Sequence, residues 1–230
     1  MKPTTRLYLF IGVLTLVAMA CAVGGGDSGG GDTGSGGGDA NLLYEDDFSN
    51  TGSGWDRYSD SDGSTDYSNN QYQITINTSQ WLMWANPGRS FTDAIIEVDA
   101  TTVGLTAESD TEDDNNFGII CRHQDTDNFY VLVISSDGYY GIRKRFQGAS
   151  ELAFIGLDGM DTSDAINTGN ATNHLKAECV GGTLRLIVNG TTLLEVTDTD
   201  IPSGDSGLMA GTFSSTSTTI LFDNFSVRQP

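Results

Sequence analysis

The chain has 230 residues, of which thirty-one are acidic and eleven are basic, for a formal net charge of −20. A surface this acidic repels nucleic acids and anionic membrane lipids, so neither is expected as a partner. The part after residue 41 has the size of one large β-domain rather than two.

Residues 1–20 are typical of a secretory signal peptide. Lys2 and Arg6 precede an apolar run from Leu7 to Val17, and the small residues AMA follow it. The run is shorter than the roughly 20 apolar residues that a transmembrane helix needs. We therefore expect the mature protein to leave the cytoplasm with a formal net charge of −22, from nine basic and thirty-one acidic residues.

The junction at Cys21 resembles a bacterial lipobox, in which a cysteine after a small residue is diacylated and becomes the new N-terminus. Ala18 stands where lipoboxes usually carry leucine, and AMA also satisfies ordinary signal peptidase. Residues 21–41 are almost entirely Gly, Ser, Thr and Asp, as in a flexible linker. This linker favours lipidation of Cys21 and a place on the extracellular face of the cell envelope. Plain secretion is the alternative.

Residues 42–230 have a hydrophobic period of two nearly throughout, which is typical of β-strands. The expected strands are, in chain order, Tyr72–Ile76, Ala94–Ala100, Phe117–His123, Phe129–Ser135, Tyr139–Phe146, His174–Val180, Thr183–Asn189 and Ile220–Val227. Two-residue turns at 137–138, 181–182 and 189–190 join several of these strands as hairpins. The pattern predicts an all-β domain, an antiparallel two-sheet β-sandwich of about a dozen strands. The segment 129–134 is apolar on both faces, as expected of a central strand covered on each side.

Both cysteines of the predicted domain lie on the apolar face of their strand. Alternation places Cys121 beside Ile119 and Cys179 beside Leu175. Because a buried thiol in apolar surroundings is a poor nucleophile, a catalytic pair of Cys121 with His123 is disfavoured. In an exported chain, the two cysteines are either a disulfide between strands or two free core thiols.

Glu97 and Asp99 are the only candidates for catalytic carboxylates. Their segment AIIEVDATT invites comparison with family 16 glucanases, which carry Glu-x-Asp and then a second Glu on the same strand. Here Thr101 and Thr102 follow instead, so the acid/base carboxylate is missing. A strand with one solvated face accounts for both acidic residues without catalysis.

Three acidic loops, residues 59–66, 108–116 and 124–128, have closely spaced oxygen side chains of the kind that calcium prefers. The candidate ligands of a structural calcium ion are Asp60, Asp62 and Asp66, or Asp125 and Asp127. Solvated acidic loops without metal are the alternative. We expect no other cofactor.

Sugar binding needs aromatic faces flanked by a few polar side chains that hydrogen-bond hydroxyl groups. The candidate ligand-binding residues are Trp81, Trp84, Tyr139, Tyr140, Arg122, Arg143 and Arg145. Arg122 is expected on the strand face opposite Cys121, while Arg143 and Arg145 share a face in a small basic island. The alternative is that the tryptophans belong to the core and the arginines only balance acidic loops.

The order of segments, from DDFSN and SGW through NNFGIICRHQDTDNFYVLVISSDGYYGIRKRF and NHLKAECVGGTLRLIVNGTTLLEVTD to FDNFSV, resembles the concanavalin A-like lectin/glucanase domains of exported bacterial proteins. Within that superfamily it is most similar to the group labelled 3-keto-disaccharide hydrolase-like. The resemblance implies a jelly roll of two antiparallel sheets, with Phe48 and Phe225 near paired terminal strands. It also implies a concave sheet that holds glycans in relatives.

These observations predict a surface-tethered, non-catalytic binding module for extracellular carbohydrate. We expect it to be a monomer that meets the membrane only through its N-terminal lipid. The first alternative is a glycoside hydrolase that uses Glu97 and Asp99, and the second is a structural or adhesion protein of the envelope. A fold of this kind hosts all three classes, so the choice depends on the site.

Overall fold

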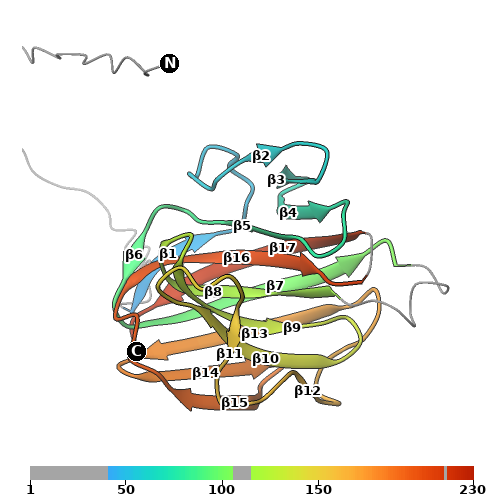
Figure 1. Cartoon of the computed structure of the whole chain (residues 1–230). Helices are drawn as coiled ribbons and strands as arrows, with labels where there is room; N and C mark the ends of the chain where they lie inside the picture. Colours follow the sequence, from blue (N-terminus) through green and yellow to red (C-terminus); the bar gives the residue numbers. More distant parts are fainter. Residues whose placement is uncertain (1–40, 106–114, 215–216) are drawn as a thin grey trace, which may run out of the picture. The chain divides into compact units, whose positions relative to one another are not determined.

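The computed structural model describes residues 41–105, 115–214 and 217–230. These residues form two antiparallel β-sheets, which confirms the predicted two-sheet β-sandwich (Figure 1). No helix in this part of the chain is long and apolar enough to cross a membrane. The signal peptide, Cys21, nearly all of the linker and most of the second acidic loop lie outside the described residues.

The first sheet, sheet A, has the strand order β15-β14-β13-β7-β17-β4-β3-β2, and β1 also pairs with β17. Its strands are β1 (Leu42–Asp46), β2 (Tyr58–Ser59), β3 (Gly63–Ser68), β4 (Gln71–Ile76), β7 (Ala94–Val103), β13 (Thr172–Val180), β14 (Thr183–Val188), β15 (Thr191–Thr197) and β17 (Thr218–Arg228). Because β17 is long, its first half pairs with β4 and its second half with β1. The first and last strands of the domain therefore lie side by side.

The second sheet, sheet B, has the order β11-β10-β9-β8-β16-β5, with β12 on β10 and β6 on β16. Its strands are β5 (Leu82–Ala85), β6 (Ser90–Phe91), β8 (Asn115–Asp125), β9 (Asn128–Ile134), β10 (Tyr139–Arg145), β11 (Ala153–Phe154), β12 (Asp161–Thr162) and β16 (Gly204–Thr212). The described residues hold more strands than the dozen expected, mainly because β2, β6, β11 and β12 are two-residue pairings too short to leave a periodic signal.

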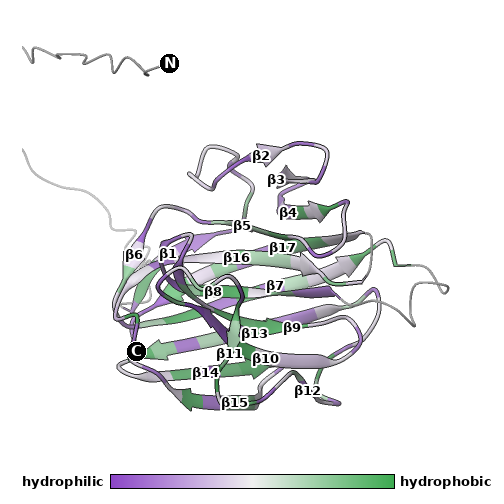
Figure 2. Ribbon diagram, viewed as in Figure 1, coloured by the Kyte–Doolittle hydropathy of each residue, from purple (hydrophilic) through white to green (hydrophobic). Residues whose placement is uncertain are grey.

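The main core lies between the two sheets and follows the predicted alternation. Ile96 and Val98 of β7 and Ile119 of β8 are fully buried, as are the other inward positions of these strands. In Figure 2, hydrophobic (green) and hydrophilic (purple) stretches accordingly follow one another along the strands. Each such side chain contributes roughly 1.5–3 kcal/mol when it leaves water, so this alternation supplies most of the stability of the sandwich. Phe48 and Phe225 lie in the same core, where both rings contact Trp55.

A second apolar layer covers the outer face of sheet B, which is the face turned away from the core. Its buried residues are Ile120, Phe129, Val131, Val133 and Met209. Leu82, Trp84, Leu152 and Met160 pack over them and are only partly buried. Strand β9 is thus covered on both faces, as its continuous apolar segment predicts.

The predicted disulfide is present and joins Cys121 of β8 to Cys179 of β13. Because β8 belongs to sheet B and β13 to sheet A, the bond crosses the core and links the two sheets. Both cysteines are buried, as the alternation of their strands indicates. This excludes the alternative of two free core thiols.

Candidate functional site

The outer face of sheet B brings together residues from five neighbouring strands. The register aligns Gly141 of β10, Val133 of β9, Gly118 of β8, Met209 of β16 and Trp84 of β5 in one row. Residues two apart on each strand share this face, so Tyr139 and Arg143 also point outward from β10. The row explains how positions far apart in the sequence meet on one surface.

Arg143 lies above this face and is held by groups of the protein itself. Its Nε and one terminal nitrogen donate hydrogen bonds to the Leu152 carbonyl oxygen, at 3.2 and 3.0 Å. Its guanidinium carbon lies 4.7 Å from the ring centre of Phe154 and 5.9 Å from that of Phe213. Burial lowers the pKa of Arg143, while Glu151 opposes the shift. The guanidinium of Arg143 therefore lies close to two aromatic rings beside the apolar layer.

Three aromatic side chains, Trp81, Tyr139 and Phe213, remain exposed, and we call them the aromatic rim. Their exposed fractions are 44%, 41% and 37%, and within the described residues only Leu43 and Tyr58 are comparably exposed large apolar side chains.

The rim residues belong to one end of sheet B. Trp81 and Thr212 exchange two hydrogen bonds, so Trp81 lies next to the residue that precedes Phe213. Tyr139 begins β10, on the face that carries Arg143. The β4–β5 turn and β12, which pairs with Tyr139, lie toward the end of the sandwich opposite the start of β1 and the C-terminus (Figure 1).

Trp84 lies on the same outer face, but within a packed group of rings. Its ring centre is 6.2 Å from that of His123 and 5.9 Å from that of Phe129, and the latter two are 5.6 Å apart. Burial lowers the pKa of His123, whereas the charges of Asp125 and Asp56 oppose the shift. The buried Nε2 of His123 has no hydrogen-bond partner among the described residues. Trp84 thus serves packing more than contact with solvent.

Two further candidates are engaged in the protein. Tyr140 points into the core with Ile142, because it alternates with the outward-facing Tyr139 and Gly141. Arg145 points outward and donates hydrogen bonds to three exposed loop carbonyls, those of Thr126, Ala149 and Ser150. We therefore leave Tyr140 out of the candidate surface and regard Arg145 as a residue that holds loops.

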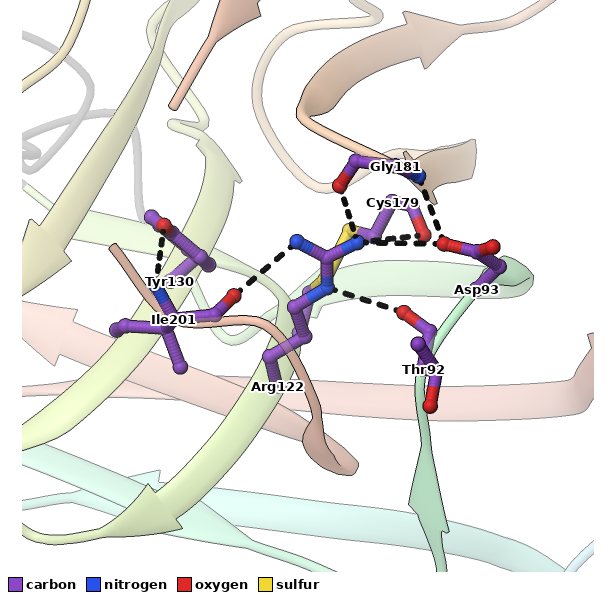
Figure 3. Close-up of a disulfide and its surroundings, with 8 residues drawn as sticks. Thr92, Asp93, Arg122, Tyr130, Cys179, Gly181 and Ile201 are labelled. Carbon is purple, nitrogen blue, oxygen red and sulfur yellow. Dashed lines mark hydrogen bonds and ion pairs between the residues drawn. A yellow bond between two sulfur atoms is a disulfide. The ribbon is translucent and has the colours of Figure 1, made fainter. Parts of the chain in front are cut away.

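Arg122 lies inside the protein, contrary to the expectation of a solvent-facing glycan contact. Only 3% of it is exposed, and its guanidinium donates hydrogen bonds to four carbonyl oxygens beside the disulfide (Figure 3). These carbonyls belong to Thr92, Cys179, Gly181 and Ile201. The Asp93 carboxylate, at 3.5 Å, balances the charge. With its donors occupied, Arg122 has a structural role.

The prediction for Arg122 fails because β8 is irregular at this point. The pairing of β8 with β9 shifts between Cys121 and Asp125, and Arg122 has a φ of 57°. Such a bulge breaks the alternation of side chains and redirects the residue that adopts it. A period-two pattern therefore assigns the wrong environment to Arg122.

Glu97 and Asp99 lie on the outer face of sheet A, on the other layer from the aromatic rim. Glu97 is 3.4 Å from the Lys176 ammonium and 4.0 Å from Arg228. Asp99 accepts a hydrogen bond from the Asn224 amide at 2.9 Å and lies 2.8 Å from His174 Nδ1. These surroundings are those of a polar, solvated strand face, which is the alternative to catalysis expected from the sequence.

An open depression of about 670 Å³ nevertheless borders this part of sheet A. Glu97, His174, Asn224 and Arg228 line it, together with acidic residues from β1. Asn224 has a φ of 55° at an irregularity of β17, which displaces the backbone there. Of the predicted carboxylate pair, Glu97 lines the depression, and Asp99 reaches it only through its contact with His174.

The candidate calcium ligands are mainly engaged in local hydrogen bonds. Asp60 accepts hydrogen bonds from the backbone of Asp62 and Gly63, and Asp66 pairs with Arg57 at 2.7 Å. In the other loop, Asp125 accepts from the backbone N–H of Asp127 and from the Asn128 amide. Within the described ranges, no three His, Cys, Asp or Glu side chains are grouped to hold a metal. Calcium binding stays an untested prediction.

Phe154 and Phe213 are surface residues that sequence reasoning did not select. Phe154 belongs to a two-residue strand and Phe213 follows the last residue of β16, so neither lies in a periodic segment. An aromatic residue just beyond a strand, as in GTFSS, is the only signal that the sequence offers.

Comparisons with known proteins agree on the fold. No family model and no curated protein matches the sequence. Among solved structures, the carbohydrate-binding module CBM66 from Bacillus subtilis is similar, with a TM-score of 0.59 and 17% identity, over 76% of this chain and 96% of that one. A Bacillus subtilis protein of unknown function with a galectin-like fold has a TM-score of 0.59 and 11% identity, over 82% and 96%.

A glycoside hydrolase is also among the similar structures. The endo-β-galactosidase from Clostridium perfringens that releases GlcNAcα1-4Gal has a TM-score of 0.56 and 8% identity, over 83% of this chain and 63% of that one. At these identities the likeness concerns the fold alone. The chain shares a β-sandwich fold with a binding module and with a hydrolase, so the fold by itself does not select a function.

Proposed function

We propose that this protein is a non-catalytic binding module for extracellular carbohydrate, and that the aromatic rim is its contact surface. The observation that carries the proposal is the exposure of Trp81, Tyr139 and Phe213 at one end of sheet B. Exposed aromatic rings are costly to leave in water and are the side chains that stack on the apolar faces of sugar rings. The carbohydrate-binding module among the similar structures supports this choice of ligand.

Arg143 gives the rim a rigid support. Its hydrogen bonds to Leu152 order its own side chain, and its guanidinium lies over the rings of Phe154 and Phe213, which favours one position of the Phe213 ring before any ligand arrives. A side chain that is already ordered loses less entropy on binding, which favours affinity. In this role Arg143 positions an aromatic contact.

The tether is the second part of the proposal. A lipid on Cys21 followed by the Gly-rich linker would hold the sandwich at the extracellular face of the envelope as a monomer. The resemblance to the 3-keto-disaccharide hydrolase-like group is consistent with an exported sandwich. The test is incorporation of labelled fatty acid in a bacterial host. We expect label in the native protein and none in Cys21→Ser, which should leave the membrane fraction; an unlabelled native protein would contradict lipidation.

Binding is tested with a glycan array followed by calorimetry on the purified protein. We expect Trp81→Ala to weaken binding about tenfold or more, because a stacked aromatic side chain often contributes more than 1 kcal/mol to an interface. Tyr58→Ala is the matched control, since Tyr58 is an exposed aromatic residue of sheet A, with 55% of its surface exposed. Binding that survives Trp81→Ala, or falls equally with Tyr58→Ala, would contradict the assignment of the rim.

A glycoside hydrolase is the second candidate function, and the depression beside Glu97 and His174 favours it. In that case Asp99 would orient the His174 imidazole and Glu97 would face the substrate. Hydrolysis of a panel of oligosaccharides, measured as released reducing ends, would have to fall at least a hundredfold in Glu97→Gln or Asp99→Asn, on the order expected for lost general acid–base catalysis. Hydrolysis that both variants retain would remove this site.

A further inference from the structure

A second depression, of about 500 Å³, opens beside the aromatic rim. Asp137, Gly138, Thr162, Ser163, Asp164 and Thr168 line it. Tyr139 borders it, because it follows Gly138 directly and pairs with Thr162 across β10 and β12. The volume falls in the range of ordinary small-ligand sites, roughly 300–1,000 Å³.

Backbone hydrogen bonds hold the walls of this depression together. The Ser163 N–H donates to the Gly138 carbonyl at 3.0 Å, and the Gly169 N–H donates to the Ser136 carbonyl at 2.7 Å. Gly138 has a φ of 96°, and a Cβ at this position would lie 3.4 Å from the Thr168 methyl group. The turn and the 162–169 segment are thus joined by hydrogen bonds, and the positive φ at residue 138 favours glycine there.

The lining is rich in oxygen and poor in apolar surface. Thr162, Ser163 and Thr168 carry hydroxyl groups, and Asp137 and Asp164 carry carboxylates. Asp164 is exposed, and within the described residues its carboxylate makes no hydrogen bond or ion pair. A carboxylate forms strong hydrogen bonds with hydroxyl groups, because the acceptor is charged. Tyr139, which follows Gly138 in the chain, has an exposed ring, and such a ring is the kind of apolar face on which a sugar ring stacks.

The negative charge of the residues around this depression limits the class of ligand that it can bind. Neither residues 135–142 nor residues 155–173 contain a lysine or an arginine, whereas they include Asp137, Asp158, Asp161 and Asp164. Nearby carboxylates repel anionic groups by several kT where no cation balances them. Uronate or sulfate groups are therefore disfavoured in this depression.

We propose that this depression is a subsite for one unit of an uncharged glycan, with Asp164 accepting sugar hydroxyl groups and Tyr139 stacking on the ring. The inference rests on the proposed carbohydrate-binding function and extends it to a definite place and ligand class. The subsite adjoins the aromatic rim, so one oligosaccharide would contact both.

The experiment uses an array of neutral β-glucan, mannan, galactan and fructan oligosaccharides, together with oligomannuronate as the anionic probe and deacetylated chito-oligosaccharide as the cationic probe. Calorimetry with the tightest neutral probe then compares the native protein with Asp164→Asn and Tyr139→Ala. We expect each variant to lose about fivefold to tenfold in affinity, as for one charge-assisted hydrogen bond or one stacked ring. Glu195→Gln, the same change of charge at an exposed position on β15 of sheet A, should leave affinity unchanged.

The outcomes separate this subsite from the proposed function. Neutral-glycan binding that Trp81→Ala weakens and both subsite variants leave unchanged would overturn the subsite and keep the function. Tighter binding of oligomannuronate or deacetylated chito-oligosaccharide would overturn the uncharged class. No binding to any probe would overturn both. Melting curves that match the native protein verify that Asp164→Asn and Tyr139→Ala are folded.

Discussion

Replacing Arg122 with methionine tests whether the buried guanidinium is structural. Methionine keeps an unbranched side chain of similar length but removes all the donors that now bind four carbonyl oxygens. Asp93 is 45% exposed and stays solvated without its partner, so the main cost is the loss of donors to the carbonyl oxygens, about 1–3 kcal/mol for each one left unsatisfied. Because some of these carbonyls can turn to water, we expect the free energy of unfolding to fall by about 4 kcal/mol.

Urea unfolding followed by tryptophan fluorescence, without reductant, measures this loss. Arg145→Met is the matched control, because Arg145 also donates to three carbonyls but does so at an exposed loop. Exposed polar contacts contribute little, so the control should cost less than about 1 kcal/mol. If Arg122→Met costs no more than Arg145→Met, the buried guanidinium is not what holds the sheets together.

Three further predictions concern stability. Replacing both Cys121 and Cys179 with serine should lower the free energy of unfolding by about 4 kcal/mol, from the chain entropy of a loop closed across 58 residues; a loss under about 1 kcal/mol would contradict this. His123 has a pKa below its usual 6.5, so the neutral ring is favoured in the fold. The contribution of the neutral His123 ring to stability is complete above pH 6.5 and is lost as the pH falls through the lowered pKa. His123→Phe should therefore flatten the decline of the melting temperature on acidification. A variant whose melting temperature depends on pH as that of the native protein does would refute this prediction. If calcium binds the acidic loops, it should raise the melting temperature in the native protein and less in Asp60→Asn or Asp125→Asn, whereas an identical temperature with calcium and with chelator would remove the prediction.

Alternation in the sequence was sufficient to predict the environment of regular strand residues. Cys121 and Cys179 each sit on an apolar stripe, and the structure buries both and joins them. Residues 129–134 are apolar without interruption, and both faces of β9 are covered. These predictions succeed because side chains of a regular strand must alternate between two faces, whatever the rest of the fold does.

Sites were harder to predict, for reasons visible in single residues. Tyr139 and Tyr140 look equivalent as neighbours, yet one is exposed and the other points into the core. The side chain of Arg122 does not follow the alternation, because β8 has a bulge at this residue. Phe213 has no periodic context but reaches the guanidinium of Arg143, which lies about seventy residues earlier in the chain.

The sequence by itself determined the fold class, the acidic surface and the faces of the two cysteines, because composition and period-two alternation are local properties. Only the tertiary structure decided which aromatic residues stay exposed, that Arg122 binds carbonyls from four separate positions, and that Glu97 and Asp99 lie on the sheet opposite the aromatic rim. These properties depend on strand order and on contacts between residues distant in the chain. No local pattern encodes them, since the pairing of β8 with β16 or of β7 with β17 is fixed only when the whole sandwich closes.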